Sequence, residues 1–185
     1  MVSINDVKLK TIIFATYYAI MKKILTLFIA ISFISCNDGD FDIPNFQFNN
    51  TIYSCDNYVL YVTNNSKTET LVITLTNNEL GTDIGTVSYP VNSSRKAVYR
   101  LFKSAIDNNY FCQTIPPITP SVISELDAIS ATINITTSEV KDKDNVLTGY
   151  SYDISFSDLL FKDSDGRIFY ESFPFGSFEI DLEDL

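Results

Sequence analysis

Apolar and polar residues alternate through much of the C-terminal third of the chain. In residues 129–136 the apolar side chains occupy the odd positions, and in residues 150–157 they occupy the even positions. A period of two places the apolar side chains on one face, as in a half-buried β-strand. The charged sequence KDKDN at residues 141–145 separates the two stretches. The pattern therefore predicts a β-hairpin in this region.

Further strands are predicted on both sides of this hairpin. Residues 58–63 are rich in β-branched and aromatic side chains, residues 69–76 alternate, and the turn composition of residues 64–67 indicates a second hairpin. The other expected extended segments are 41–48, interrupted by Pro44 as in an edge strand, 96–103, 167–170 and 173–180, the last two after a tight turn at 163–166.

The remaining segments predict connections rather than helices. Residues 81–90 form an irregular polar stretch, residues 115–120 form a proline-rich connector between two sheets, and residues 121–126 fit one short helical turn. No long amphipathic helix is predicted after residue 36. Strands at this spacing indicate an all-β fold, an antiparallel β-sandwich of the Ig-like or Greek-key type or a barrel. We expect residues 43–185 to form a single β domain.

The N-terminal region carries a different pattern. Lys22 and Lys23 precede an uninterrupted apolar run at residues 24–34, which ends in Ser35 and Cys36. The run has the length of a signal-peptide core and is shorter than a full membrane span. We therefore expect export from the cytosol.

The end of this run resembles the lipobox of bacterial lipoproteins, here Phe33, Ile34, Ser35 and Cys36, with phenylalanine in place of the usual leucine. The resemblance implies cleavage before Cys36 and a diacylglycerol and an acyl chain such as palmitate on that cysteine. Apart from this covalent lipid, no cofactor is expected.

The residues after the cysteine resemble the acidic export signal of Bacteroidota surface lipoproteins, through Asn37, Asp38 and Asp40. This resemblance implies an outer-membrane protein, lipid-anchored and exposed at the cell surface. The alternative is that residues 36–42 are only an acidic tether between the anchor and the domain. The rest of the chain is reminiscent of uncharacterised small lipoproteins of that group, and this brings no activity with it.

Residues 1–35 are interpreted as an upstream extension followed by the signal peptide. A single apolar span across the whole segment is disfavoured, because Lys22 and Lys23 would lie within it at a cost of several kcal/mol. Translation that begins at Met21 explains the sequence more simply.

Cys55 and Cys112 remain once the anchor has taken Cys36. Outside the cytosol such a pair is expected to form a disulfide. Its loop of nearly 60 residues would contribute about 4 kcal/mol by loop-closure entropy. The alternative is two separate thiols, and a zinc site has little support because the chain has no histidine.

Charge argues against nucleic acid as a partner. The formal net charge is -10, and loss of four lysines and one aspartate with the signal segment makes it about -13. A polyanion is repelled by such a surface.

Few chemistries are open to this chain. Without histidine, Ser-His-Asp and Cys-His arrangements cannot form, and we predict no catalytic residue and no metal ligand. The alternatives are a glycosidase-like surface hydrolase using a carboxylate pair, or calcium held by aspartate-rich turns. The candidates are Asp153 with Asp158 and Glu171 with Glu179 for the pair, and Asp142, Asp144, Asp163 and Asp165 for calcium.

The predicted function is that of a lipid-anchored binding or structural module of the cell envelope. Its expected partners are the membrane, through the lipid, and a glycan or an envelope protein. The aromatic residues, 14% of the chain, are assigned mainly to the core. An accessory subunit of an envelope complex is a further alternative, favoured by a large exposed apolar patch.

Overall fold

The computed structural model describes residues 46–55, 58–76, 79–163 and 166–185. These residues belong to one compact unit, Phe41–Leu185. The residues predicted for the signal, the lipid anchor and the export signal lie outside the described residues; they are Lys22, Lys23, Phe33, Ile34, Ser35, Cys36, Asn37, Asp38 and Asp40.

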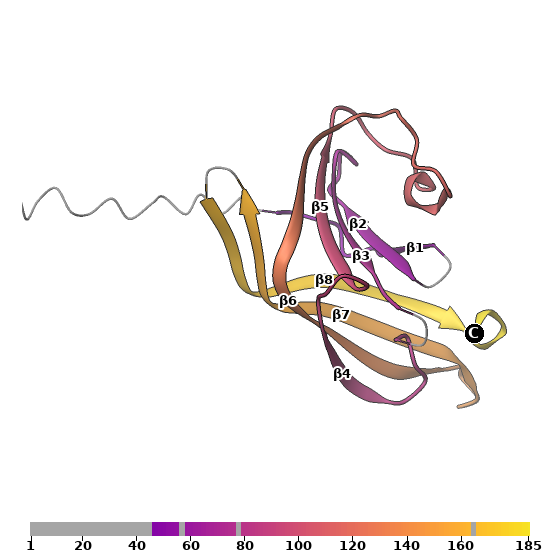
Figure 1. The fold of residues 1–185 in the computed structure, drawn as a ribbon. Coiled ribbons are helices and arrows are strands. Elements are labelled where there is room, and N and C mark those ends of the chain that lie inside the picture. Colours follow the sequence, from indigo (N-terminus) through magenta and orange to yellow (C-terminus); the bar gives the residue numbers. More distant parts are fainter. Residues whose placement is uncertain (1–45, 56–57, 77–78, 164–165) are drawn as a thin grey trace, which may run out of the picture. The chain divides into compact units, whose positions relative to one another are not determined.

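The described chain is almost entirely β-structure, which confirms the predicted all-β class (Figure 1). All strand pairs are antiparallel. In chain order the elements are β1 (Tyr53–Cys55), β2 (Val59–Thr63), β3 (Glu69–Thr74), β4 (Gly85–Pro90), β5 (Lys96–Phe102), the 3-10 helix η1 (Tyr110–Cys112), β6 (Val122–Lys141), β7 (Leu147–Asp163), β8 (Gly166–Asp181) and the 3-10 helix η2 (Leu182–Asp184).

Strand order follows the chain order from β1 to β8 except that β4 leaves the path and pairs with β6. The long strand β6 is shared between two parts of the sheet. Its first residues pair with β5, from Val122 to Asp127, whereas β4 pairs with the same edge further along, from Thr132 to Thr137. Between these two stretches the register of β6 against β7 shifts at Ala128 and again at Ser130. Irregularities of this kind bend a strand, so β6 can serve both parts.

The main hydrophobic core is built from most of the alternating positions that the sequence pattern indicated. Ile129 is an exception, because it is 56% exposed where the register of β6 shifts. Strands β2 and β3 contribute Leu60, Val62, Leu71 and Ile73, and β6 to β8 contribute the larger share. From these three strands the buried residues include Ile133, Ile135, Tyr152, Ile154, Phe156, Phe161, Phe173 and Phe175. The predicted hairpin of residues 129–157 is therefore confirmed, and its two strands supply much of the core.

A second, smaller cluster lies on the opposite face of β2 and β3. It contains Tyr61 and Val72 from these strands together with Ile106 and Tyr110 from the connection between β5 and β6. Because neighbouring residues of a strand point to opposite faces, the run VLYVT in β2 supplies both clusters. This part of the sheet is consequently buried on both sides.

Some of the predicted boundaries were wrong. Residues 122–126 are strand rather than a helical turn, because pairing with β5 and the β-branched Val122 and Ile123 favour an extended chain. The irregular stretch 81–90 contains β4, and residues 167–170 and 173–180 lie in the single strand β8. In the predicted segment 41–48, residues 46–48 are not part of a strand, and the others lie outside the described ranges.

Gly176 allows the chain before β1 to approach β8. It has a φ of +144°, and a Cβ built there would lie 2.6 Å from the backbone oxygen of Asn50. Thr51 forms a parallel bridge with the adjacent Ser177. A side chain at position 176 would therefore force Asn50 away from β8.

Candidate binding surface

The connection between β5 and β6, residues 103–121, is the most prominent irregular segment of the described structure. Its ends are held together by a hydrogen bond from the Lys103 amide to the Ser121 carbonyl, 3.0 Å long. A compact surface loop with adjoining ends that packs its own side chains is similar to an Ω-loop, a type that frequently carries function, although this segment is longer than most of them. We call this segment the Ω-loop. In Figure 1 it joins the ends of β5 and β6 and extends away from the sheets.

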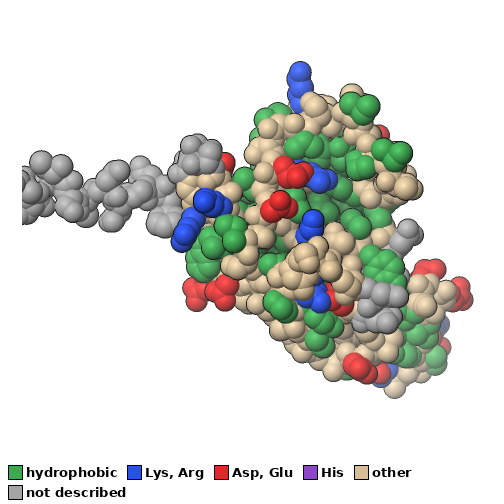
Figure 2. Space-filling view, viewed as in Figure 1, with side chains coloured by type: hydrophobic (Ala, Val, Ile, Leu, Met, Phe, Trp, Pro, Cys, Tyr) green, Lys and Arg blue, Asp and Glu red, His purple; other side chains and the backbone are tan. Residues whose placement is uncertain are grey.

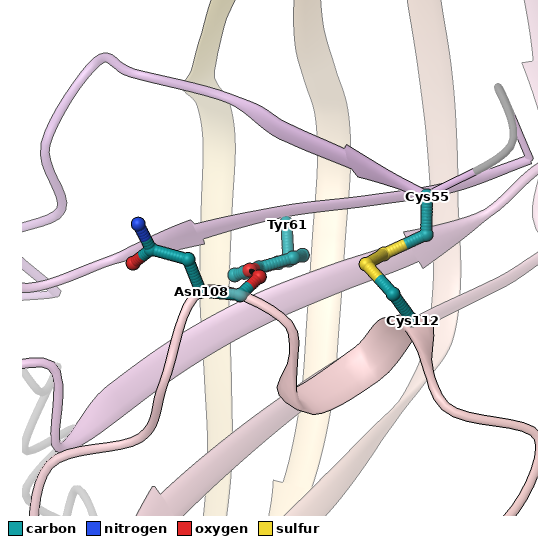
Figure 3. Close-up of a disulfide and its surroundings, with 4 residues drawn as sticks. All are labelled: Cys55, Tyr61, Asn108 and Cys112. Atoms are coloured by element: carbon teal, nitrogen blue, oxygen red, sulfur yellow. Dashed lines mark hydrogen bonds between the residues drawn. A yellow bond between two sulfur atoms is a disulfide. The ribbon is translucent and has the colours of Figure 1, made fainter.

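A disulfide attaches the Ω-loop to the edge of the sheet (Figure 3). It joins Cys55 at the end of β1 to Cys112 at the end of η1, with 5.1 Å between the Cα atoms. The predicted pairing of these cysteines is therefore present. The bond links two segments that are 57 residues apart in the chain, so it restricts both the loop and the edge strand.

Buried aromatic side chains support the Ω-loop from below. The Tyr61 hydroxyl donates a hydrogen bond to the Asn108 carbonyl oxygen, towards which it points in Figure 3. Burial and the neighbouring Tyr53 raise the pKa of Tyr61 to about 12. The phenol therefore stays protonated, and remains a donor, well above neutral pH.

Two further contacts hold the outer part of the loop. The Tyr110 hydroxyl donates to the Pro117 carbonyl over 3.3 Å, and the Arg100 guanidinium lies 5.6 Å from the centre of the Phe111 ring. Lys67, in the turn between β2 and β3, donates to Asn108 Oδ1 over 2.8 Å. The loop is therefore fixed at several points along its length.

The tip of the Ω-loop exposes apolar side chains. Ile115 is 81% exposed and Ile118 is 92% exposed, more than any other large hydrophobic residue among those described. Val122 and Ile123, the first residues of β6, are exposed as well. Figure 2 shows hydrophobic side chains on the surface of this end of the molecule. A braced loop that holds bulky apolar groups in water has the character of a protein-binding surface.

A polar depression of about 480 Å³ lies beside the base of the loop. Its lining consists of Lys67, Asp107, Asn108, Asn109 and Gln113. Amide and carboxylate groups of this kind suit sugar hydroxyls, but none of these five lining residues supplies the aromatic ring on which sugars stack. The depression therefore supports a glycan ligand less well than the apolar tip supports a protein partner.

A second depression, of about 230 Å³, lies where β6 leaves β5 and meets β4. It is smaller than the usual ligand pocket. One of its lining residues, Arg95, is already bound to Glu79 through Nε at 2.7 Å and to the Pro90 carbonyl through Nη1 at 2.6 Å. This ion pair holds the connection after β4 in place and occupies the guanidinium of Arg95.

The carboxylates considered for catalysis lie on the solvent side of β7 and β8, where all four are exposed. Asp153 and Asp158 are on one strand about 16 Å apart, and Glu171 and Glu179 are about 26 Å apart, judged from the rise of a strand. Glycosidase pairs are separated by about 5 to 10 Å. Asp158 and Glu171 lie between the paired positions Ser157–Ser172 and Leu159–Tyr170, but neither lines either depression described above.

Of the aspartates considered for calcium, Asp142 has another structural role for its carboxylate. Asp142 Oδ1 accepts hydrogen bonds of 2.9 Å from the amides of Asp144 and Val146, so this carboxylate shapes its own turn. Asp163 pairs with Gly166 across the next turn, and Asp165 lies outside the described residues. No cluster of three or more acidic, cysteine or histidine side chains suited to a metal occurs in the described ranges.

The sequence identifies the cysteines and the proline-rich connector, and its proline content favours a crossing between sheets over a ligand for a proline-recognition domain. The Ω-loop as a binding surface was missed. A signal for it was present in the isoleucines of IPPITP, which have no polar alternation and no strand to bury them.

Comparison with known proteins gives no match, whether with family models, with curated proteins or with solved structures. The class defined here is therefore one of architecture: an antiparallel all-β domain with a disulfide-braced Ω-loop. No helix in the described part of the chain is long and apolar enough to cross a membrane.

Proposed function

We propose that this protein is a lipid-anchored module of the bacterial outer membrane, exposed at the cell surface, that binds a partner protein through its Ω-loop. The anchor rests on the resemblance of Phe33–Cys36 to a lipobox and on the acidic residues that follow. The disulfide supports an oxidising compartment.

The binding role is carried by the exposure of Ile115 and Ile118 on a braced loop. Holding two bulky apolar side chains in water is unfavourable unless a partner covers them, and each fully buried isoleucine contributes about 1.5 to 3 kcal/mol. Because the disulfide and the aromatic cluster order the loop beforehand, little conformational entropy is lost when a partner binds.

The anchor is tested by labelling cells with a palmitate analogue. We expect label and membrane retention for the parent and loss of both for Cys36→Ser. An intact mass that begins at Cys36 supports cleavage at the lipobox, whereas residues before Cys36 on the mature protein contradict it. Protease treatment of intact cells tests surface exposure, and Asp38→Ala/Asp40→Ala should reduce degradation if these residues are the export signal.

Binding is tested by mild cross-linking in membranes followed by purification. The variant Ile115→Ser/Ile118→Ser should lose a partner protein that the parent retains. The matched control is Ile84→Ser/Ile129→Ser, because these isoleucines are also exposed but lie outside the loop. Equal recovery of the partner with all three proteins contradicts a role for the loop tip.

An accessory role in an envelope complex is the same binding function with a resident partner, and the cross-linking experiment identifies it by the protein recovered. A carboxylate hydrolase is the competing class. If the protein released sugar from envelope glycans, and Asp158→Asn or Glu171→Gln abolished this, the binding assignment would be replaced.

A further inference from the structure

Strand β4 has one edge that is paired and one that is not. On its inner edge it pairs with β6 from Gly85 to Pro90. In the described sheet β4 pairs with β6 alone, so no described strand lies along its outer edge, as Figure 1 shows. The other two sheet margins differ: β1 has three residues, and β8 is approached by the chain at Thr51. The outer edge of β4, from Gly85 to Pro90, is therefore free in the described structure.

The direction of each backbone group on β4 follows from the ladder. The Val91 amide donates to the Ala131 carbonyl of β6 over 3.0 Å. Because inward and outward residues alternate in an antiparallel pair, Gly85, Val87 and Tyr89 also bond to β6, whereas Thr86 and Ser88 direct their amides and carbonyls outward.

The hydrogen bonds of the side chains agree with this assignment. Residues that do not exchange backbone bonds have the closest side chains, and Thr86 Oγ1 lies 2.8 Å from Thr136 Oγ1. Ser88 Oγ donates to Asn134 Oδ1 over 2.7 Å. Thr86 and Ser88 therefore present two amide donors and two carbonyl acceptors at the free edge.

The edge lacks the features that usually prevent pairing. No residue from Gly85 to Pro90 is charged, although Lys is the common protection of natural edge strands. Val87 is 45% exposed even though it lies opposite the buried Ile135 on the core side of the sheet. Only Pro90 limits the edge, and its carbonyl is already bound by Arg95.

The sequence of β4 is complementary to itself in one antiparallel register. With Val87 opposite Val87 of a second copy, Thr86 lies opposite Ser88, and the two symmetric Thr86–Ser88 pairs form four backbone hydrogen bonds. Tyr89 lies opposite Gly85, and a Cβ built on Gly85 would meet nothing within 4 Å, so space is open over the glycine. The Tyr89 ring also contacts Arg95 of its own chain, whose guanidinium lies 4.8 Å from the ring centre. Aromatic side chains that cover an edge glycine stabilise strand pairing.

We propose that two copies of this protein associate through β4, with the two strands antiparallel about Val87, so that the sheets of both copies join into one. The interface carries no charged side chain, and therefore avoids repulsion within the pair of strands between two acidic molecules. The inference goes beyond the proposed function, since it is independent of the anchor and of what the Ω-loop binds.

The register is tested by cysteine cross-linking of the full-length protein. Val87→Cys places two thiols opposite each other at a separation suited to a disulfide, so mild oxidation should give a covalent dimer. The control is Val146→Cys, a valine with 58% exposure in the turn between β6 and β7, which should stay monomeric. Equal dimer yields from both variants, or a cross-link from Val87→Cys to another protein only, overturn the proposal.

Charge exchange distinguishes pairing from misfolding. Two differently tagged copies that both carry Val87→Lys, or both Val87→Glu, place like charges opposite each other, and their co-purification should fall about fivefold. One Lys copy with one Glu copy should recover to within threefold of the parent. Retention by like-charged copies, or failure of the mixed pair to recover, contradicts association through Val87.

Discussion

The disulfide offers the sharpest test of how this domain is stabilised. Substituting both cysteines, Cys55→Ala and Cys112→Ala, removes a crosslink between residues 57 positions apart. In the loop-entropy relation, a closed loop of this length lowers the entropy of the unfolded chain enough to contribute about 4 kcal/mol at 25 °C. The loss should therefore arise mainly in the unfolded state, while the main core between β2, β3 and β6 to β8 is unchanged.

Equilibrium urea unfolding measures this loss. The chain has no tryptophan, so tyrosine fluorescence and far-ultraviolet circular dichroism are the suitable signals. With a urea dependence of about 2 kcal/mol per molar, a loss of about 4 kcal/mol lowers the midpoint by about 2 M. The parent in reductant should approach the variant, whereas reductant should leave the variant unchanged.

The comparison also separates loop entropy from lost packing. The reduced parent keeps both sulfur atoms, and Cys55 is buried, so it preserves contacts that alanine removes. If the oxidised and reduced parents unfold within about 0.5 kcal/mol of each other, the entropic reasoning is refuted. The Ω-loop would then be held by its aromatic contacts alone.

Three further changes have expected outcomes. Glu79→Gln should lower the free energy of unfolding in urea by about 3 kcal/mol, because it leaves the nearly buried Arg95 without its charge partner. Burial raises the pKa of Glu79, but the hydrogen bonds from Arg95 and Thr76 outweigh this effect, so the pKa is lowered. The parent should therefore lose this stability as the pH falls below about 4.5, and the variant should not. Because the pKa of Tyr61 is raised to about 12, stability should fall as the pH rises from about 10 towards 12. Tyr61→Phe should lessen this dependence in pH-resolved unfolding without removing it, because burial also raises the pKa of Tyr99, Tyr152 and Tyr170. Gly176→Ala should lower the free energy of unfolding by about 2 kcal/mol through its positive φ and the close backbone of the segment before β1, and a melting temperature equal to the parent's would contradict this.

The sequence alone was sufficient for the fold class and for most strands. The alternation in residues 129–136 and 150–157 is a local property, because a strand with one buried face needs an apolar side chain at every second position. The disulfide was predicted from the number of cysteines, since two of the three remain in an exported chain after one is used for the anchor.

Tertiary structure decided what local signals leave open. Residues 122–126 became strand because β5 pairs with them, and β4 became an edge strand because the bend in β6 exposes a second stretch of its edge. Neither partner is near in sequence. Likewise, the sequence IPPITP by itself predicts only a connector. The disulfide of Cys112 and the hydrogen bond of Tyr110 fix this segment in the structure, where both of its isoleucines are exposed to water. Burial and pairing depend on distant residues, and this dependence is why periodicity alone did not predict them.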